Sequence, residues 1–124
     1  MHNNHEELVN GFFEELKGIF ENSEQGIYLY LDDMHKVCNK KFASLLGYKS
    51  PADWAKMDQP FPEIFVDKKS QNALVGAYQK AMEKMAASTI KVKWKKKSGK
   101  GVSTTVILVP IAYKNHLFAL HFVY

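Results

Sequence analysis

Cysteine is nearly absent from the sequence: Cys38 is the single example among 124 residues. One cysteine excludes an internal disulfide framework and any zinc site built mainly from cysteines, and it fits a reducing compartment. Long apolar runs are also missing, because the longest, Val106 to Tyr113, is too short to span a bilayer and contains a proline. Residues 1–7 lack the basic start and apolar stretch of a secretory signal. We therefore expect a soluble, cytoplasmic protein without a membrane partner.

Recognisable catalytic motifs are absent as well. The sequence has no glycine-rich phosphate loop, no HExxH or GxSxG motif and no helix with paired carboxylates. Asp32 and Asp33 are interpreted as a turn, without a defined partner for acid–base chemistry. The sequence therefore predicts that the protein is not an enzyme and has no catalytic residue.

Histidine offers few candidates for a site. His35 and His116 lie near predicted turns, and His121 lies on the last predicted strand. A neutral, hydrogen-bonded core position is expected for His121, with ligand contact or pH sensing as the alternative. His2 and His5 are three residues apart, a spacing that suits adventitious metal binding only, so no specific metal site is predicted.

The sequence does contain enough apolar material for one packed domain, since 46% of its residues are hydrophobic and 13% are aromatic. Its formal net charge is +4. Part of this charge gathers on one predicted hairpin, which carries Lys91, Lys93, Lys95, Lys96, Lys97 and Lys100. Because no aromatic residue is interleaved on the lysine side to stack bases, a solvated strand face is favoured over a surface for nucleic acid or anionic membranes.

Apolar residues recur at helical spacing over residues 5–21, which predicts an amphipathic helix. We expect residues 1–21 to form this helix and residues 22–124 to form the domain that follows. A strand is expected over residues 27–31, with Tyr28 and Tyr30 on the face opposite to Ile27 and Leu29. The later pattern predicts a short strand, short helices, one long helix and three antiparallel strands, over residues 35–38, 39–65, 68–87 and 89–124.

The segment Asn39 to Tyr48 reads N-K-K-F-A-S-L-L-G-Y and follows the first two predicted strands. Asn39 suits a helix N-cap, and Gly47 suits a helix end. With the hairpin at residues 90–99 and the apolar strand at residues 106–111, this order resembles a PAS domain over nearly the whole chain. The resemblance implies an α+β fold: a five-stranded antiparallel sheet in the order 2-1-5-4-3, with helices on one face and an N-terminal amphipathic helix.

In some PAS domains the sheet and the helices enclose a small ligand. On that resemblance the ligand-binding positions are Leu29, Phe42, Leu46, Tyr78, Met82, Val92, Trp94, Val106, Leu108 and His121; the alternative is that all of them are ordinary core residues. The flavin–cysteine mode is not supported, because Cys38 precedes Asn39 on a strand. The haem–histidine mode is not supported either, because residues 68–87 contain no histidine. The cofactor is therefore unassigned.

The resemblance implies a signal-sensing and interaction module that binds a small ligand or a partner protein and transmits a conformational change. We expect the N-terminal helix to pack on the outer sheet face or across a homodimer, through Leu8, Phe12, Phe13, Leu16, Phe20, Tyr28, Tyr30, Phe118, Leu120 and Phe122. The alternatives are a ligand-free adaptor and a small isomerase or dehydratase with an α+β cone. The acidic-apolar-threonine signature that often follows the last PAS strand is missing, so the chain is interpreted as a stand-alone module or a fragment.

Overall fold

The computed structural model describes residues 4–124. The described chain begins with α1 (Asn4–Asn22), followed by β1 (Gly26–Asp32) and β2 (His35–Cys38). The helices α2 (Lys40–Leu45), α3 (Pro51–Ala55), α4 (Phe61–Phe65) and α5 (Lys68–Lys84) come next. The last elements are β3 (Ser88–Lys95), β4 (Gly101–Tyr113) and β5 (His116–Val123). The prediction made for His2 lies outside the described residues.

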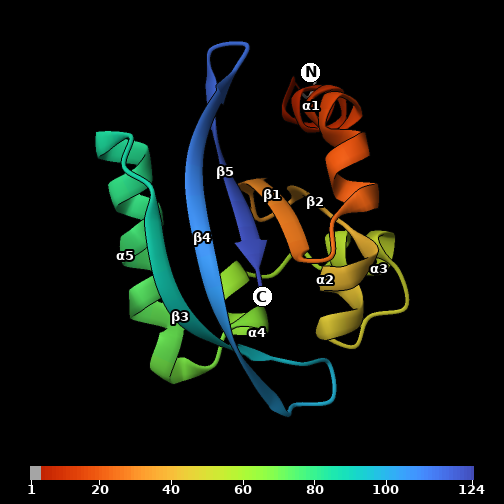
Figure 1. Cartoon of the computed structure of the whole chain (residues 1–124), viewed down its shortest axis with the longest axis vertical. Coiled ribbons are helices and arrows are strands. Elements are labelled where there is room, and N and C mark those ends of the chain that lie inside the picture. Colours follow the sequence, from red (N-terminus) through yellow and green to blue (C-terminus); the bar gives the residue numbers. More distant parts are fainter. Residues whose placement is uncertain (1–3) are drawn as a thin grey trace.

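The strands form one antiparallel sheet in the order β2-β1-β5-β4-β3, which confirms the predicted topology. β5 lies in the centre of the sheet, between β1 and the long, curved β4 (Figure 1). β5 buries apolar side chains on both faces because both faces are covered. One helix followed by two strands does not match the α+β cone of the enzyme alternative, which begins with long helices.

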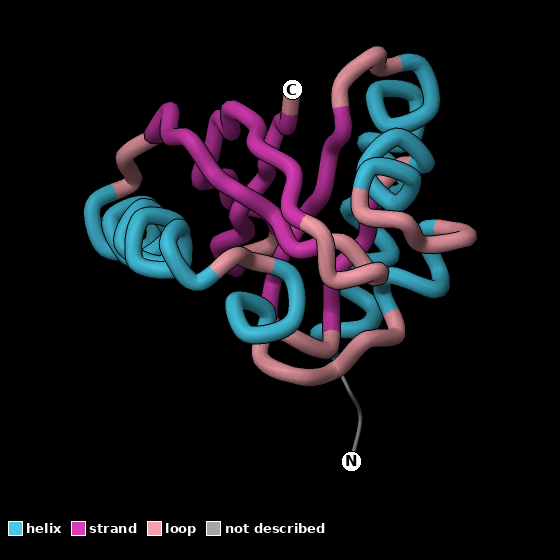
Figure 2. Tube along the Cα trace, turned by 90° about the horizontal axis from the view of Figure 1, so that it is seen from below, coloured by secondary structure: helices cyan, strands magenta, loops and turns pink. Residues whose placement is uncertain are grey.

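The larger core lies between the inner face of the sheet and helices α2 to α5. Trp54 of α3, Phe65 of α4 and Trp94 of β3 are fully buried in this layer. In Figure 2 the strands run through the middle of the molecule with helices on either side. The inner sheet face and helices α2 to α5 therefore surround a common interior.

A second core lies on the outer sheet face, where α1 packs against β1 and β5. Phe12 stacks on Tyr113 of β4 with ring centroids 4.5 Å apart, and it meets Phe118 of β5 edge-on at 5.1 Å. The approach is close at Gly11, where a Cβ atom would lie 2.9 Å from the Tyr113 hydroxyl. The apolar face of α1 is therefore buried on the sheet of its own chain, which is one of the two positions expected for it.

Asn39 joins the two layers through its buried side chain. The side-chain oxygen accepts hydrogen bonds from the N–H groups of Ile27 and Phe42, both at 3.0 Å. The side-chain nitrogen donates to the carbonyl groups of Phe20 and Gln25, at 3.2 and 2.9 Å. One amide therefore caps α2, as predicted, and also ties the end of α1 to the start of β1.

The long helix α5 begins as predicted and ends earlier than predicted. Asp67 caps its start by accepting a hydrogen bond from the N–H of Lys69. At its end Met85 adopts the left-handed conformation, with φ 53° and ψ 39°, and its N–H bonds the carbonyl of Ala81. A left-handed residue terminates a helix. Residues 85–87 therefore lie outside α5.

The two faces of β1 are the reverse of the predicted ones. Tyr28 belongs to the inner core, whereas Ile27 and Leu29 lie against α1 on the outer face. The tyrosines on one face and the aliphatic residues on the other can both be buried, so the alternation along β1 has no polar face that would indicate which side is exposed to solvent. The pairing with β5 determines which side chains of β1 face inward. Tyr28 lies opposite His121 and Leu29 lies opposite Leu120, and directly paired residues share a face of the sheet.

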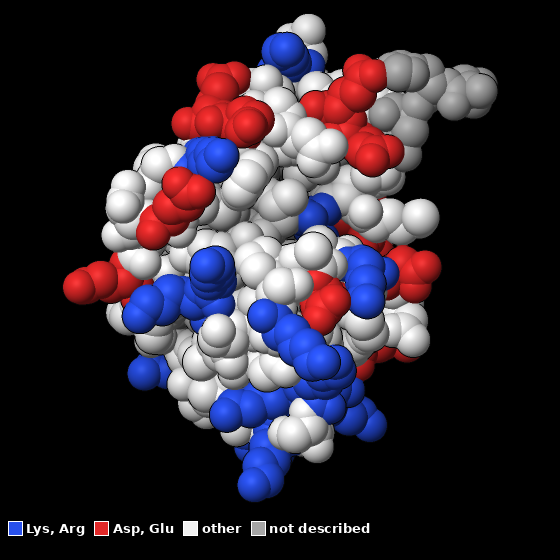
Figure 3. Space-filling model, turned by 90° about the vertical axis from the view of Figure 1, so that its right-hand side faces the viewer, with Lys and Arg blue, Asp and Glu red and all other residues white. Residues whose placement is uncertain are grey.

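Charge is unevenly distributed over the surface. In Figure 3 lysine side chains gather at the lower end of the face shown, which is the end at which the β3–β4 hairpin turns in Figure 1. Acidic side chains lie more toward the upper end, where α1 lies in Figure 1. Lys91, Lys93, Lys97 and Lys100 of this hairpin are exposed. Among the described helices, none is long and apolar enough to cross a membrane.

Candidate functional site

A half-open pocket of about 270 Å³, referred to below as the inner cavity, lies where β1 and β5 face α4 and α5. Its walls are mainly aromatic: Tyr28 stacks on Phe61 at 5.3 Å, and Tyr30 meets Phe61 and Tyr78 edge-on at 5.4 Å each. An apolar wall with a few polar groups is the usual composition of a small-molecule site. The lining residues are Tyr28, Tyr30, Asp33, Phe61, Pro62, Leu74, Val75, Tyr78, Gln79 and His121.

Asp33 fixes one side of this cavity. Its carboxylate accepts a hydrogen bond from the Tyr30 hydroxyl at 2.8 Å and another from the N–H of Phe61 at 3.0 Å. The second bond holds the start of α4 against the β1–β2 turn. Burial, followed by the contact with Asp33, raises the pKa of Tyr30 well above its ordinary value. The Tyr30 hydroxyl therefore stays protonated and acts as the donor.

Two residues of the wall each have a buried polar atom without a hydrogen bond of ordinary geometry within residues 4–124, the Tyr28 hydroxyl and Nδ1 of His121, although the His121 ring also interacts with the backbone of Ala119 and Tyr28. Burial lowers the pKa of His121 to about 3, and burial also raises the pKa of Tyr28 well above its ordinary value. Both side chains are therefore neutral near pH 7. A buried polar atom without a partner is costly, and because both atoms are covered in the ligand-free chain, a ligand would reach them only after the wall rearranges.

The structure brings two of the predicted ligand-binding residues, Tyr78 and His121, to the cavity wall. Met82 is half-buried beside the inner core. Leu29 lies on the outer sheet face against α1, so its assignment to the ligand wall is wrong. The remaining predicted residues are buried in the inner core without lining the cavity: Phe42, Leu46, Val92, Trp94, Val106 and Leu108.

Residues predicted for a dimer interface are largely packed within one chain. Those buried between α1 and the sheet are Phe12, Phe20, Phe118 and Leu120, and those half-buried there are Leu8, Phe13, Leu16 and Phe122. Tyr28 and Tyr30 face the cavity instead, so their assignment to the interface is wrong. The cause is the same inversion of the two faces of β1. Sequence reasoning therefore missed Tyr28 and Tyr30 as wall residues, and it also missed Asp33, Phe61, Pro62, Leu74 and Gln79.

The residues present do not fit the flavin–cysteine mode. Cys38 is buried on β2 and does not line the cavity. Burial raises the pKa of its thiol to about 12, so the reactive thiolate is scarce. A haem ligand would have to come from another element than α5, since Lys68–Lys84 contains no histidine.

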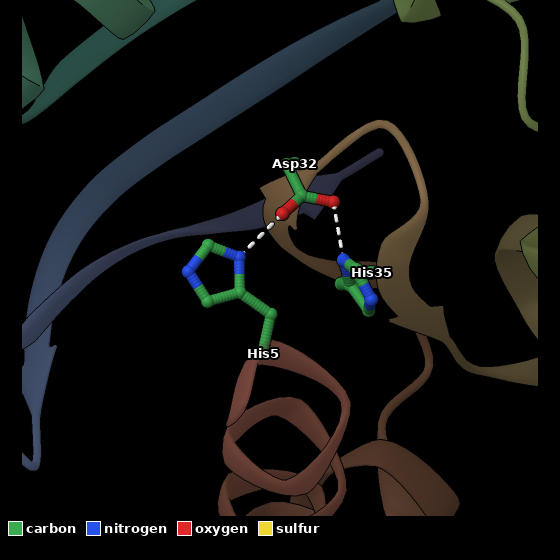
Figure 4. Close-up of side chains that lie close together, drawn as sticks. All are labelled: His5, Asp32 and His35. Carbon is green, nitrogen blue, oxygen red and sulfur yellow. Dashed lines mark hydrogen bonds and ion pairs between the residues drawn. The ribbon is translucent and has the colours of Figure 1, made fainter. Parts of the chain in front are cut away.

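A second cluster joins His5 of α1, Asp32 of β1 and His35 of β2 (Figure 4). The Asp32 carboxylate accepts hydrogen bonds from Nδ1 of His5 at 2.7 Å and Nδ1 of His35 at 2.6 Å. Burial alone would raise the pKa of Asp32, but the bonds from His5 and His35 outweigh it and lower that pKa. The interpretation of Asp32 as a turn residue without a partner is therefore wrong. None of the three residues lines the inner cavity.

Comparison with known proteins identifies the fold. No protein-family model and no curated protein matches the chain. A PAS domain from a two-component sensor histidine kinase superposes with a TM-score of 0.68 at 14% identity, over 93% of this chain and 96% of that one. The PAS domain of a protein from Colwellia psychrerythraea gives a TM-score of 0.70 at 18% identity, over 91% and 95% of the two chains.

A LOV protein from Rhodobacter sphaeroides is also similar, with a TM-score of 0.69 at 12% identity over 93% of this chain and 66% of that one. These identities are low, so the likeness concerns the fold alone. The sheet order, the helices over its inner face and these neighbours agree. The chain has the fold of a PAS domain.

Proposed function

We propose that this chain is a signal-sensing domain that binds a small, flat molecule in the inner cavity. The observation that carries the proposal is the pair of buried, unpartnered polar atoms, Tyr28 Oη and His121 Nδ1, in an otherwise aromatic wall. The fold supports a sensing role, since a PAS domain of a sensor histidine kinase is among its structural neighbours. The proposal includes no catalytic role.

The cavity restricts the ligand by size and chemistry. Its volume of about 270 Å³ is close to the lower end of the ~300–1,000 Å³ of typical small-molecule sites. The rings of Tyr28, Phe61 and Tyr78 favour a planar ligand, and the Asp33 carboxylate disfavours an anion. A neutral or cationic molecule of one or two rings, with a hydroxyl, carbonyl or amide near Tyr28 and His121, meets these requirements.

The signal would leave the cavity through the sheet. A ligand in the cavity contacts the inner side of β1 and β5, and the outer side of the same strands supports α1. Leu29 and Leu120 lie opposite each other on these strands and pack beneath α1. A ligand that favours one packing of the two strands therefore shifts the population of α1 positions.

Native mass spectrometry and an absorbance spectrum of the freshly purified chain test the proposal. We expect a bound mass above that of the bare 14.2 kDa chain. Tyr28→Phe should reduce the bound fraction, because it removes the hydroxyl and keeps the ring. Tyr48→Phe is the matched control, because Tyr48 is buried in the same core but does not line the cavity. An equal bound fraction in both variants would contradict the proposed site.

A ligand-free adaptor is the second candidate function. It is favoured by the close packing of the core beside the cavity, where Phe42, Trp94 and Leu108 are fully buried. An adaptor would give the mass of the bare chain in every preparation, and changes at Tyr28 would alter stability without altering any bound mass.

We also propose that the chain forms a homodimer through the exposed side of α1. Ile19 is 53% exposed, and Leu8, Phe13 and Leu16 are only half-buried on the sheet. Apolar side chains of this kind are suited to contact a second copy. Light scattering over a range of concentrations should show a dimer that Ile19→Asp weakens. A wild-type chain that stays monomeric throughout that range would contradict the dimer.

A further inference from the structure

We propose that His5, Asp32 and His35 form a binding site for a divalent transition-metal ion, with Zn²⁺ the best-suited ion. Each residue offers one ligand atom, and the three atoms lie within 4.8 Å of one another. Figure 4 shows both imidazole rings directed at the Asp32 carboxylate, one from α1 and one from the β1–β2 hairpin. His5 and Asp32 are 27 residues apart in the sequence, so the fold creates this cluster.

The donor set selects the class of ion. Two imidazoles and one carboxylate are a set that zinc takes in catalytic sites, where a further position is left to water or another ligand. Imidazole also suits copper, nickel and ferrous iron, whereas Mg²⁺ and Ca²⁺ prefer oxygen ligands. A transition-metal ion of intermediate hardness, such as Zn²⁺, therefore fits the three residues better than a hard cation such as Mg²⁺ or Ca²⁺ does.

An ion can enter after the side chains rotate and after Nδ1 of His5 and of His35 each give up the proton that it now donates to Asp32, either to Nε2 of the same ring or to water. Zinc bonds of ~2.0–2.1 Å in tetrahedral geometry place neighbouring ligand atoms ~3.4 Å apart. The observed N–O contacts of 2.7 and 2.6 Å are shorter than this, and all three ligand atoms lie within 4.8 Å of one another. Both the His5 and the Asp32 side chains are exposed enough to rotate, at 44% and 37%, while His35, at 15%, is held more firmly.

Electrostatics at the site have two opposing parts. His5 lies in the first turn of α1, and the N-terminal end of a helix disfavours a cation. The Asp32 carboxylate offsets this effect, because it is in direct contact with both imidazoles. Glu6 and Glu7 add negative charge to the same turn of the helix. The local field therefore favours a divalent cation in spite of the net positive charge of the chain.

A further imidazole stands beside the cluster. The ring of His116, at the start of β5, lies edge-on to the ring of His5 with centroids 5.6 Å apart. Its Nδ1 is 3.1 Å from the carbonyl of Lys114, a bond in which the nitrogen is the donor. A histidine that donates through Nδ1 keeps the lone pair of Nε2 for a metal. His116 lies outside the group of three residues whose ligand atoms are within 4.8 Å of one another, so its ring would have to move before it could supply a fourth ligand.

Calorimetric titration of the full chain with ZnCl₂ alone tests the proposal, together with the visible absorption of Co²⁺ as a probe of coordination. We expect one equivalent of zinc to bind and to raise the thermal midpoint, because the site exists only in the folded chain. Asp32→Asn and His35→Gln should each weaken zinc binding by at least about tenfold. His116→Gln should weaken it less than either.

His2→Gln is the matched control, because His2 and His5 are spaced to bind metal without any fold. This variant should keep the zinc affinity of the wild type. Loss of binding in His2→Gln with retention in Asp32→Asn and His35→Gln would overturn the proposal, and so would a wild-type chain that binds no zinc. Circular dichroism checks that each variant is folded. Zinc binding of equal strength by the chain unfolded in guanidinium would also overturn the proposal.

Discussion

Tyr28 and His121 stack face to face across β1 and β5, with ring centroids 3.8 Å apart and ring planes within 9° of parallel. The two residues are direct partners in the antiparallel register of these strands. Each ring keeps one polar atom without a hydrogen-bond partner in the described part of the chain. A polar atom that is buried without a hydrogen bond lowers the stability of the fold. A ligand in the adjoining cavity that formed hydrogen bonds with these two atoms would offset that cost.

Tyr28→Phe should make the ligand-free chain more stable. The substitution removes a buried hydroxyl that has no protein partner and keeps the stacked ring, so we expect the free energy of unfolding to rise by roughly 1 kcal/mol. Urea denaturation of ligand-free protein measures this change. A loss of stability of similar size would show that the hydroxyl is hydrogen-bonded in the folded chain, and the proposed ligand contact would then fail.

His121 should make the fold sensitive to acid. Burial lowers its pKa from the usual 6.5 to about 3. Between these values the unfolded chain binds a proton that the folded chain does not bind, so stability is present above about pH 6.5 and is lost as the pH falls toward 3. The slope from this one group approaches about 1.4 kcal/mol per pH unit. Urea denaturation between pH 7 and pH 4 measures it.

His121→Gln is the control for this pH dependence, because glutamine does not titrate in that range. The variant should be less stable at pH 7 and should lack the part of the slope due to His121. If wild type and variant lose stability in parallel as the pH falls, another group is responsible for the acid sensitivity.

Local signals explain which parts of the fold the sequence predicts. Asn39 can be recognised as a helix cap because its partner, the N–H of Phe42, is three residues away. The faces of β5 can be assigned because the polar His121 alternates with Phe118, Leu120 and Phe122. Order, type and pairing of the strands follow from such short-range patterns combined with the resemblance.

Long-range contacts explain what the sequence does not predict. The faces of β1 depend on its register with β5, since tyrosine and leucine are both apolar enough for a core. Lys36 is only 3% exposed, and its ammonium donates to the carbonyl groups of Asp33, Ala55 and Met57. Asp33 is three residues from Lys36, but Ala55 and Met57 are 19 and 21 residues away, so no spacing near Lys36 indicates those two acceptors. The contact between His5 and Asp32 is of the same kind.

Asn39→Ala should be among the most damaging single substitutions in the chain. It removes the cap of α2 and leaves the N–H of Ile27 and the carbonyl of Phe20 without their partner in a buried place. A lost cap costs about 1 kcal/mol and each of the two buried unpaired groups about 1–3 kcal/mol, so we expect a loss of roughly 3–7 kcal/mol. Ser50→Ala removes only the cap of α3 and should cost about 1 kcal/mol. Equal losses in the two variants would contradict the joining role of Asn39.

Phe12→Ala should loosen α1 while leaving the inner core intact. Phe12 is buried between Tyr113 and Phe118, and truncation of a buried phenylalanine costs about 3–5 kcal/mol. Glu15→Ala, at an exposed position of the same helix, should change stability by less than about 0.5 kcal/mol. Because the two cores lie on opposite faces of the sheet, hydrogen exchange should speed up in α1 of Phe12→Ala and stay slow in β4 and β5. Faster exchange throughout the sheet would show that α1 and the inner core unfold as one unit, and a signal carried by movement of α1 alone would then be excluded.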